Sequence, residues 1–255
     1  MNATVPLALD ARDCEGHFPD RPIVPGVVLL ARAGAVLVAC GMAPSLNGIR
    51  RARLRQLVAP DDKILLEARS AGDHIMVDLR RNGALVADAE FRVGPPGTTP
   101  NGSLGDLPGH AGRTPDLDAL LPHRPPMRWL RSIVDESDEG IVCMASIPRT
   151  CALAATGDVP AVAAVEAAAQ GAALWEALRR SRIAGERVQR TGYLVSMRDV
   201  EWFEPGIEAE TSFFVSAMLT ASIGTLTKYA IRATHRGSTL VRGTIGAILV
   251  AQSDG

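Results

Sequence analysis

Apolar and polar residues follow two different periods in the first 93 residues of the chain. Residues 5–9 alternate as a strand does, and the stretch from Val24 to Cys40 is apolar almost all round, as expected of a buried helix. Apolar and polar residues then alternate in four segments separated by short turn-like stretches, and this pattern predicts four strands. These strands are expected at residues 50–58, 63–70, 74–81 and 84–93.

The same order of elements returns in the second half of the chain. Two strand-like segments, at 128–134 and 140–147, precede an alanine- and leucine-rich helix at 159–180. Four more alternating segments follow it, at 193–203, 208–219, 224–235 and 239–250. One α+β unit used twice is therefore the expected fold class, with antiparallel strands wrapped around a long helix in each half.

Residues 94–115 separate the two halves. This stretch is dense in Gly, Pro, Ser and Thr and has no apolar period, which is the composition of a linker. We therefore expect an N-terminal domain at residues 1–93 and a C-terminal domain at residues 116–255.

Composition excludes several classes of protein. Apolar residues make up 47% and charged residues 22%, as in globular chains, and a net charge of −1 gives no general attraction to nucleic acid or to an anionic membrane. The longest apolar stretch, 23–42, is interrupted by Arg32 and by glycines, and the start of the chain lacks a secretory signal pattern. The four cysteines have no CxxC spacing, so we expect free thiols and a cytoplasmic location.

The segment HFPDRPIVPGVVLL, residues 17–30, resembles the signature of the 3-hydroxyacyl-carrier-protein dehydratases, the hot-dog enzymes of fatty-acid synthesis. In the second half, LLPHRPPM at 120–127 and AVEAAAQ at 164–170 look like the opening segment and the helix of the same family. Their pairing is most similar to short dehydratases of aryl polyene and related pigment pathways, in which two different hot-dog proteins act together. The resemblance implies a double hot-dog in which both types are fused.

The resemblance also implies how the site is shared. In the family, a carboxylate on the helix stands fourteen positions after the histidine, but here Ala31 stands at that distance from His17. Fourteen positions before the helix carboxylate of the second half, Glu166, stands Ala152. Each active site of a family dimer takes its histidine from one subunit and its acid from the other. We therefore predict one composite site of His17 and Glu166, and a companion site that lacks both groups.

These two groups suit the dehydration of a 3-hydroxyacyl thioester to an enoyl thioester. A neutral imidazole can take the proton from the carbon next to the carbonyl, and a carboxylic acid can protonate the departing hydroxyl. Because alanines surround Glu166, we expect a dry site that raises its pKa and keeps it protonated. Gln170, one helical turn further on, is expected to orient the carboxyl, and the N–H of Gly26 to bind the thioester oxygen.

The remaining histidines and arginines have simpler interpretations. His123 is expected to be structural and to hold the LPHRPPM segment against the sheet, while His74, His110 and His235 have no assigned function. No two histidines have metal-ligand spacing along the chain, so we expect no metal, and no cofactor apart from the phosphopantetheine arm of the substrate. Nucleotide-binding motifs are absent from the sequence. The arginines at 50, 51, 53 and 55 either meet an acidic carrier protein or form a solvated outer face.

Two other functions fit the same residues. A hot-dog thioesterase would use Glu166 to activate water, with His17 secondary. A catalytically silent acyl-binding or assembly subunit would instead support a partner dehydratase. For the dehydratase we expect an acyl carrier protein as partner, further association of hot-dog units, and neither a nucleic acid nor a membrane partner.

Overall fold

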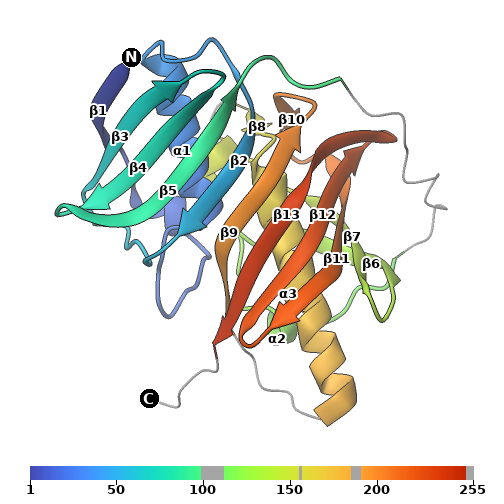
Figure 1. Ribbon diagram of the computed structural model, residues 1–255. Coiled ribbons are helices and arrows are strands. Elements are labelled where there is room, and N and C mark those ends of the chain that lie inside the picture. Colours follow the sequence, from blue (N-terminus) through green and yellow to red (C-terminus); the bar gives the residue numbers. More distant parts are fainter. Residues whose placement is uncertain (99–111, 155–156, 185–190, 251–255) are drawn as a thin grey trace.

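The computed structural model describes residues 1–98, 112–154, 157–184 and 191–250. In the first half, an antiparallel sheet curves around one long helix, α1, Gly26–Ala39 (Figure 1). A short 3₁₀ turn, η1, Ala11–Cys14, precedes the histidine turn. The strands are β1 (Asn2–Leu7), β2 (Leu46–Leu54), β3 (Ile64–Ala71), β4 (His74–Arg81) and β5 (Ala84–Val93).

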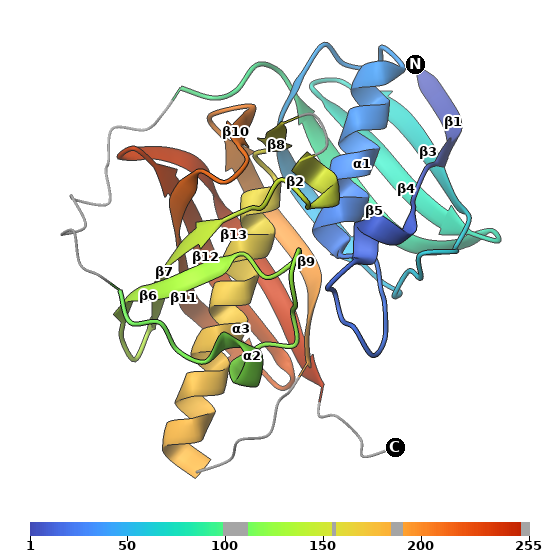
Figure 2. The same ribbon diagram turned by 180° about the vertical axis from the view of Figure 1, so that it is seen from behind.

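The second half repeats this plan around a longer helix, α3, Ala163–Ala184, as the view from behind also shows (Figure 2). A short helix, α2, Leu117–Leu120, and a 3₁₀ turn, η2, Ala152–Ala154, precede it. The sheet strands are β6 (Leu130–Glu136), β7 (Gly140–Ser146), β9 (Thr191–Trp202), β11 (Ser212–Ile223), β12 (Leu226–His235) and β13 (Ser238–Val250). Two further strands, β8 (Asp158–Pro160) and β10 (Gly206–Glu208), pair with each other.

The two sheets are joined edge to edge by strands β2 and β9. These strands pair antiparallel from Gly48 opposite Glu201 to Arg53 opposite Ser196. The described residues therefore form one 11-stranded sheet in the order β1-β3-β4-β5-β2-β9-β13-β12-β11-β7-β6. The indole N–H of Trp202 adds a hydrogen bond of 2.6 Å to the carbonyl of Leu46 across this junction. The predicted double hot-dog is confirmed, with its two sheets continuous.

Helix α1 is buried because its sequence carries apolar residues on nearly every side, and α3 is buried along its alanine- and leucine-rich part, up to its last turns. In α1 the fully covered positions include Val27, Leu30 and Leu37, and in α3 Leu174 and Trp175. Each helix packs into the hollow of its own curved sheet, which removes the apolar side chains of both from water. None of the helices in the described part of the chain has the length and apolar character that crossing a membrane requires.

The sequence placed the main elements well and their ends less well. The strand predicted at 50–58 runs instead from Leu46 to Leu54, and the segment that follows leaves the sheet. The small elements η1, α2, η2, β8 and β10 were not predicted. Most of the predicted linker lies outside the described residues. The predicted boundary between the two domains therefore stays a prediction; it falls between the end of β5 at Val93 and the start of α2 at Leu117.

Candidate active site

The histidine turn of the first half meets the opening segment of the second half at the boundary between them. The backbone N–H of Arg124 donates a hydrogen bond of 2.9 Å to the carbonyl of Gly16. Gly16 has a φ of +82°, and a Cβ at this position would lie 2.1 Å from the carbonyl oxygen of Arg124. Only glycine allows both this backbone conformation and this close approach. The contact places His17 next to His123.

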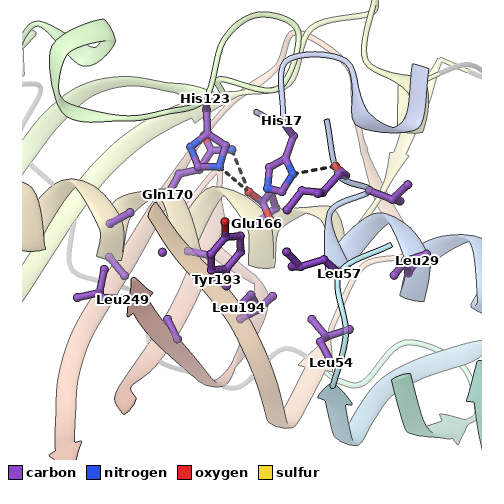
Figure 3. A pocket seen from close by; sticks show the side chains of 18 of the residues that line it. His17, Leu29, Leu54, Leu57, His123, Glu166, Gln170, Tyr193, Leu194 and Leu249 are labelled. Carbon is purple, nitrogen blue, oxygen red and sulfur yellow. Dashed lines mark hydrogen bonds and ion pairs between the residues drawn. The ribbon is translucent and has the colours of Figure 1, made fainter. Parts of the chain in front are cut away.

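Three buried side chains converge at this boundary: His17, His123 and Glu166 (Figure 3). Each offers one ligand-type atom, and these atoms all lie within 4.8 Å of one another. His123 Nε2 is 3.4 Å from Glu166 Oε1, and the rings of the two histidines are 5.3 Å apart between centroids. Phe18 stacks on His17 at 4.1 Å and meets His123 edge-on at 5.0 Å, which fixes both rings. The predicted pair is therefore brought together.

One backbone contact sets the tautomer of His17. Its Nδ1 lies 3.0 Å from the carbonyl oxygen of Ile23, which can only accept a hydrogen bond. Nδ1 therefore carries the hydrogen in the neutral ring, and Nε2 keeps its lone pair free for a proton or another ligand.

Gln170 fixes both the carboxylate and the opening segment. Its Nε2 donates to Glu166 Oε1 at 3.2 Å and to the carbonyl of Met127 at 2.7 Å. Its Oε1 accepts from the backbone N–H of Trp129 at 3.0 Å. The fully buried amide thus places Glu166 by a direct hydrogen bond, one helical turn away on α3, and ties the segment that carries His123 to the same helix.

Burial decides the pKa of His17, whereas hydrogen bonds and nearby charges decide that of Glu166. Burial lowers the pKa of His17 to about 4, so the ring is neutral at physiological pH. For Glu166, burial is the largest influence and raises the pKa. The hydrogen bond with His123, the charge interactions with His17 and His123, and the hydrogen bond from the Gln170 amide together lower it below its ordinary value. The prediction of a protonated Glu166 is therefore wrong, because the alanine-rich sequence showed the burial but not the hydrogen-bond donors.

An apolar cavity extends from these groups along α3. Glu166, Ala169, Ala173 and Glu176 recur every three or four residues and line it, so the cavity follows the helix for ten residues, about 15 Å. At the far end, the hydroxyl of Tyr229 donates a hydrogen bond of 2.8 Å to Glu176. Other lining residues are Leu29, Leu54, Leu57, Tyr193, Leu194 and Leu249 (Figure 3).

Gly26 also lines this cavity, at the first position of α1. Its N–H is one of the helix N–H groups that have no partner within the helix, so it can donate to a ligand. A Cβ at this position would meet Cδ1 of Leu54, so a larger residue here would require the Leu54 side chain to move. The predicted contact with a thioester oxygen stays a prediction.

A second cavity occupies the companion position. Ala31 and Ala152, which stand where the family pattern has a carboxylate and a histidine, line this same cavity. Arg32 lines it too, and its guanidinium forms a 2.7 Å ion pair with the buried Asp13. This cavity therefore has alanine at both positions where the family pattern has its reacting groups.

Two parts of the site were missed by the sequence. His123 was interpreted as a support against the sheet, but its ring points at Glu166 and lines the cavity. The one signal in the sequence was that this histidine lies inside the family-like motif LPHRPPM, residues 121–127. Residues 56–58 were predicted as strand, but they leave the sheet after Leu54 and form part of the cavity wall.

Most of the arginines considered for carrier binding are engaged within the chain. Arg51 pairs with Glu90 at 2.7 Å and Arg55 with Asp88 at 2.8 Å, across β2 and β5. Arg50 also lies 3.8 Å from Glu90. These contacts favour an internally paired outer face.

Two family models match different parts of the chain. The family described as ApeI-like, ApeI dehydratase, matches residues 1–87, and the family described as ApeP-like, ApeP dehydratase, matches residues 115–253, more than half of the chain. The chain belongs to the ApeP-like dehydratases. It carries an ApeI-like unit in front, so the predicted fusion of two dehydratase types is confirmed.

Curated relatives and solved structures agree with this assignment. The chain is 37% identical over 93 residues to the 3-hydroxyacyl-[acyl-carrier-protein] dehydratase FabZ of Anaeromyxobacter sp. (strain K), an alignment that covers 30% of this chain and 60% of that protein. For FabZ of Enterococcus faecalis the identity is 38% over 96 residues, covering 31% and 67%. The chain thus spans about 60% of the length of the first of these relatives and two thirds of the second.

Two solved structures share the fold. A chain of the dehydratase heterocomplex ApeI:P from Xenorhabdus doucetiae matches with 22% identity and a TM-score of 0.50, covering 55% of this chain and 94% of that one. A monomeric dehydratase domain from a trans AT polyketide synthase split module matches with 13% identity and a TM-score of 0.72, covering 98% and 100%. The second match extends over both halves and therefore supports the double hot-dog of the whole chain.

Proposed function

We propose that the chain dehydrates 3-hydroxyacyl thioesters to trans-2-enoyl thioesters at the single composite site of His17 and Glu166. The observation that carries the proposal is that a neutral, buried imidazole and a buried carboxylate from different halves face one apolar cavity. The FabZ relatives, which are named for this reaction on an acyl carrier protein, support the same substrate class. The acyl chain lies along α3, and an acyl carrier protein delivers it on the phosphopantetheine arm.

In this mechanism the Nε2 lone pair of His17 takes the proton from the carbon next to the thioester carbonyl. The N–H of Gly26 binds the carbonyl oxygen, which gains negative charge. Glu166, as a carboxylate, accepts a hydrogen bond from the β-hydroxyl and stabilises the protonated His17 by its charge. His17 then returns the same proton to the departing hydroxyl, which leaves as water. The base is restored and no net proton is consumed.

Two isosteric variants test this mechanism. His17→Asn and Glu166→Gln should each lower kcat/KM for a 3-hydroxyacyl carrier-protein thioester by about 10²–10⁴-fold. The increase in ultraviolet absorbance of the conjugated enoyl product measures the rate. His74→Asn is a matched control, because this histidine lies away from the cavity beside Asp73. Full activity of Glu166→Gln would refute the composite site.

Product analysis separates the alternatives. Mass spectrometry of the product should show an enoyl thioester that is one water lighter than the substrate. Release of free acid and thiol would instead identify a thioesterase. A chain without turnover that restores the activity of an added partner dehydratase would identify an assembly subunit.

A further inference from the structure

The cluster of His17, His123 and Glu166 has the donor set of a transition-metal site. Zinc in proteins takes imidazole nitrogen and carboxylate oxygen at about 2.0–2.2 Å, and open zinc sites commonly have three protein ligands, including the His₂Glu combination. Ligand atoms around a tetrahedral ion with these bond lengths lie about 3.3 Å apart. The 3.4 Å between His123 Nε2 and Glu166 Oε1 already has this spacing. The third ligand atom lies within 4.8 Å of both, so a movement of one side chain by about 1.5 Å would complete the set.

The surroundings of these side chains fit a metal site as well. Metal-binding histidines usually donate their other ring N–H to a carbonyl or carboxylate, and ligating carboxylates are themselves hydrogen-bonded. His17 has such a partner in the Ile23 carbonyl at 3.0 Å, and Glu166 has one in the Gln170 amide at 3.2 Å. The Nδ1 of His123 is buried and has no hydrogen-bond partner among the described residues, and its Nε2 already faces Glu166 at 3.4 Å.

We propose that His17, His123 and Glu166 bind one divalent ion of the zinc class, with a fourth position open to the cavity. Nitrogen, nitrogen and oxygen donors in a buried, partly apolar site suit Zn²⁺ or Co²⁺ better than Mg²⁺ or Ca²⁺, which prefer oxygen ligands. The bound ion occupies the Nε2 lone pair of His17 and one oxygen of Glu166. This part of the inference rests on the proposed function: the ion blocks proton abstraction by His17 and acts as a reversible inhibitor of dehydration. The expectation of no metal considered only spacing along the chain, and the folded arrangement is the reason to revise it.

Metal binding can be measured without turnover. Isothermal titration calorimetry with ZnCl₂ gives the number of ions bound per chain. The visible absorption spectrum of added Co²⁺ shows whether the ion is bound tetrahedrally. The chain for these measurements carries Cys40→Ser and His74→Asn, which remove an exposed thiol and a surface His–Asp pair that could bind zinc elsewhere. His110→Asn removes the histidine that lies outside the described residues. We expect one equivalent of ion per chain and a tetrahedral cobalt spectrum.

Single variants then assign the ligands. His123→Asn and Glu166→Gln should each abolish the tetrahedral spectrum. Gln170→Ala should weaken Zn²⁺ binding by about 10–100-fold, as loss of a hydrogen-bond partner of a ligand does. His235→Asn, in a strand end away from the cavity, is the matched control and should leave binding unchanged. Circular dichroism of each variant verifies that the chain is folded.

Several results would overturn the proposal. Absence of Zn²⁺ binding by the folded parent chain would refute it, and so would binding that His123→Asn leaves unchanged. When Zn²⁺ binds through these three residues, it should inhibit dehydration in competition with the thioester, and a chelator should restore the rate. Binding without inhibition would refute the blocking role. A chain that binds one zinc through these residues but dehydrates nothing would support the metal site and refute the proposed function.

Discussion

The unusual state of His17 predicts a specific pH dependence of stability. In the unfolded chain its pKa is about 6.5, whereas burial lowers it to about 4 in the folded chain. Between these values the unfolded chain binds the proton and the folded chain does not. Protonation therefore favours unfolding, and the contribution of His17 to stability falls as pH decreases from 6.5 toward 4.

The size of the effect follows from the two pKa values. Between pH 7 and pH 5, preferential protonation of the unfolded chain at His17 lowers the free energy of unfolding by about 2 kcal/mol. The variant His17→Asn carries no titrating group at this position and should lack this part of the pH dependence. Glu166 contributes little in this window, because its surroundings hold its pKa below the ordinary range of a glutamate and it titrates at more acidic pH.

Urea denaturation of both chains at pH 7 and pH 5 measures the effect. We expect the parent chain to lose about 2 kcal/mol more than His17→Asn over this interval. The pKa of His235 is also lowered by burial, but this residue is present in both chains and its effect cancels in the comparison. Equal losses in the two chains would mean that His17 titrates alike in the folded and unfolded states, and would refute the neutral buried base.

Three further substitutions test the rest of the site. Ala152→Ser, in the companion cavity, should leave the dehydration rate within a few-fold of the parent, and a large loss would mean that this cavity takes part in the reaction. Ala173→Phe, midway along the cavity, should lower kcat/KM for long acyl chains while short ones react normally; equal losses for both would place the acyl chain elsewhere. Gly26→Ala should destabilise the chain by about 1–3 kcal/mol in thermal unfolding, because its Cβ would meet Leu54, and it should cost less in a Leu54→Ala background; an equal cost in both backgrounds would mean that this contact is not the cause.

The sequence predicted the elements that depend on local periodicity. Helix α1 was found because its apolar residues cover nearly every side, α3 because it is rich in alanine and leucine, and the strands because their side chains alternate. Strand ends were less accurate. Residues 55–58 keep an alternating pattern, yet the chain leaves the sheet after Leu54, and this departure depends on tertiary contacts that no local pattern records.

The candidate site could be predicted only where a motif or a position in a helix identified a residue. His17 and Glu166 came from family resemblance, and Gln170 from its place one turn beyond the glutamate. His123 lies within a family-like motif but was expected to be structural. Its neighbour Glu166 is 43 residues away in the sequence, and only the fold brings the two together. The charge of Glu166 was misjudged for the same reason, since its hydrogen-bond partner His123 comes from that distant segment.

The continuous sheet has a consequence for how the two halves can change over evolutionary time. In a symmetric pair of identical subunits, every substitution occurs in both copies, so loss of one histidine destroys both reaction centres at once. A tandem chain escapes this constraint, and on the proposed function alanine at positions 31 and 152 removes one centre while sparing the other. Because β2 and β9 pair with each other within one chain, the complementary halves are always made in equal number and already in register.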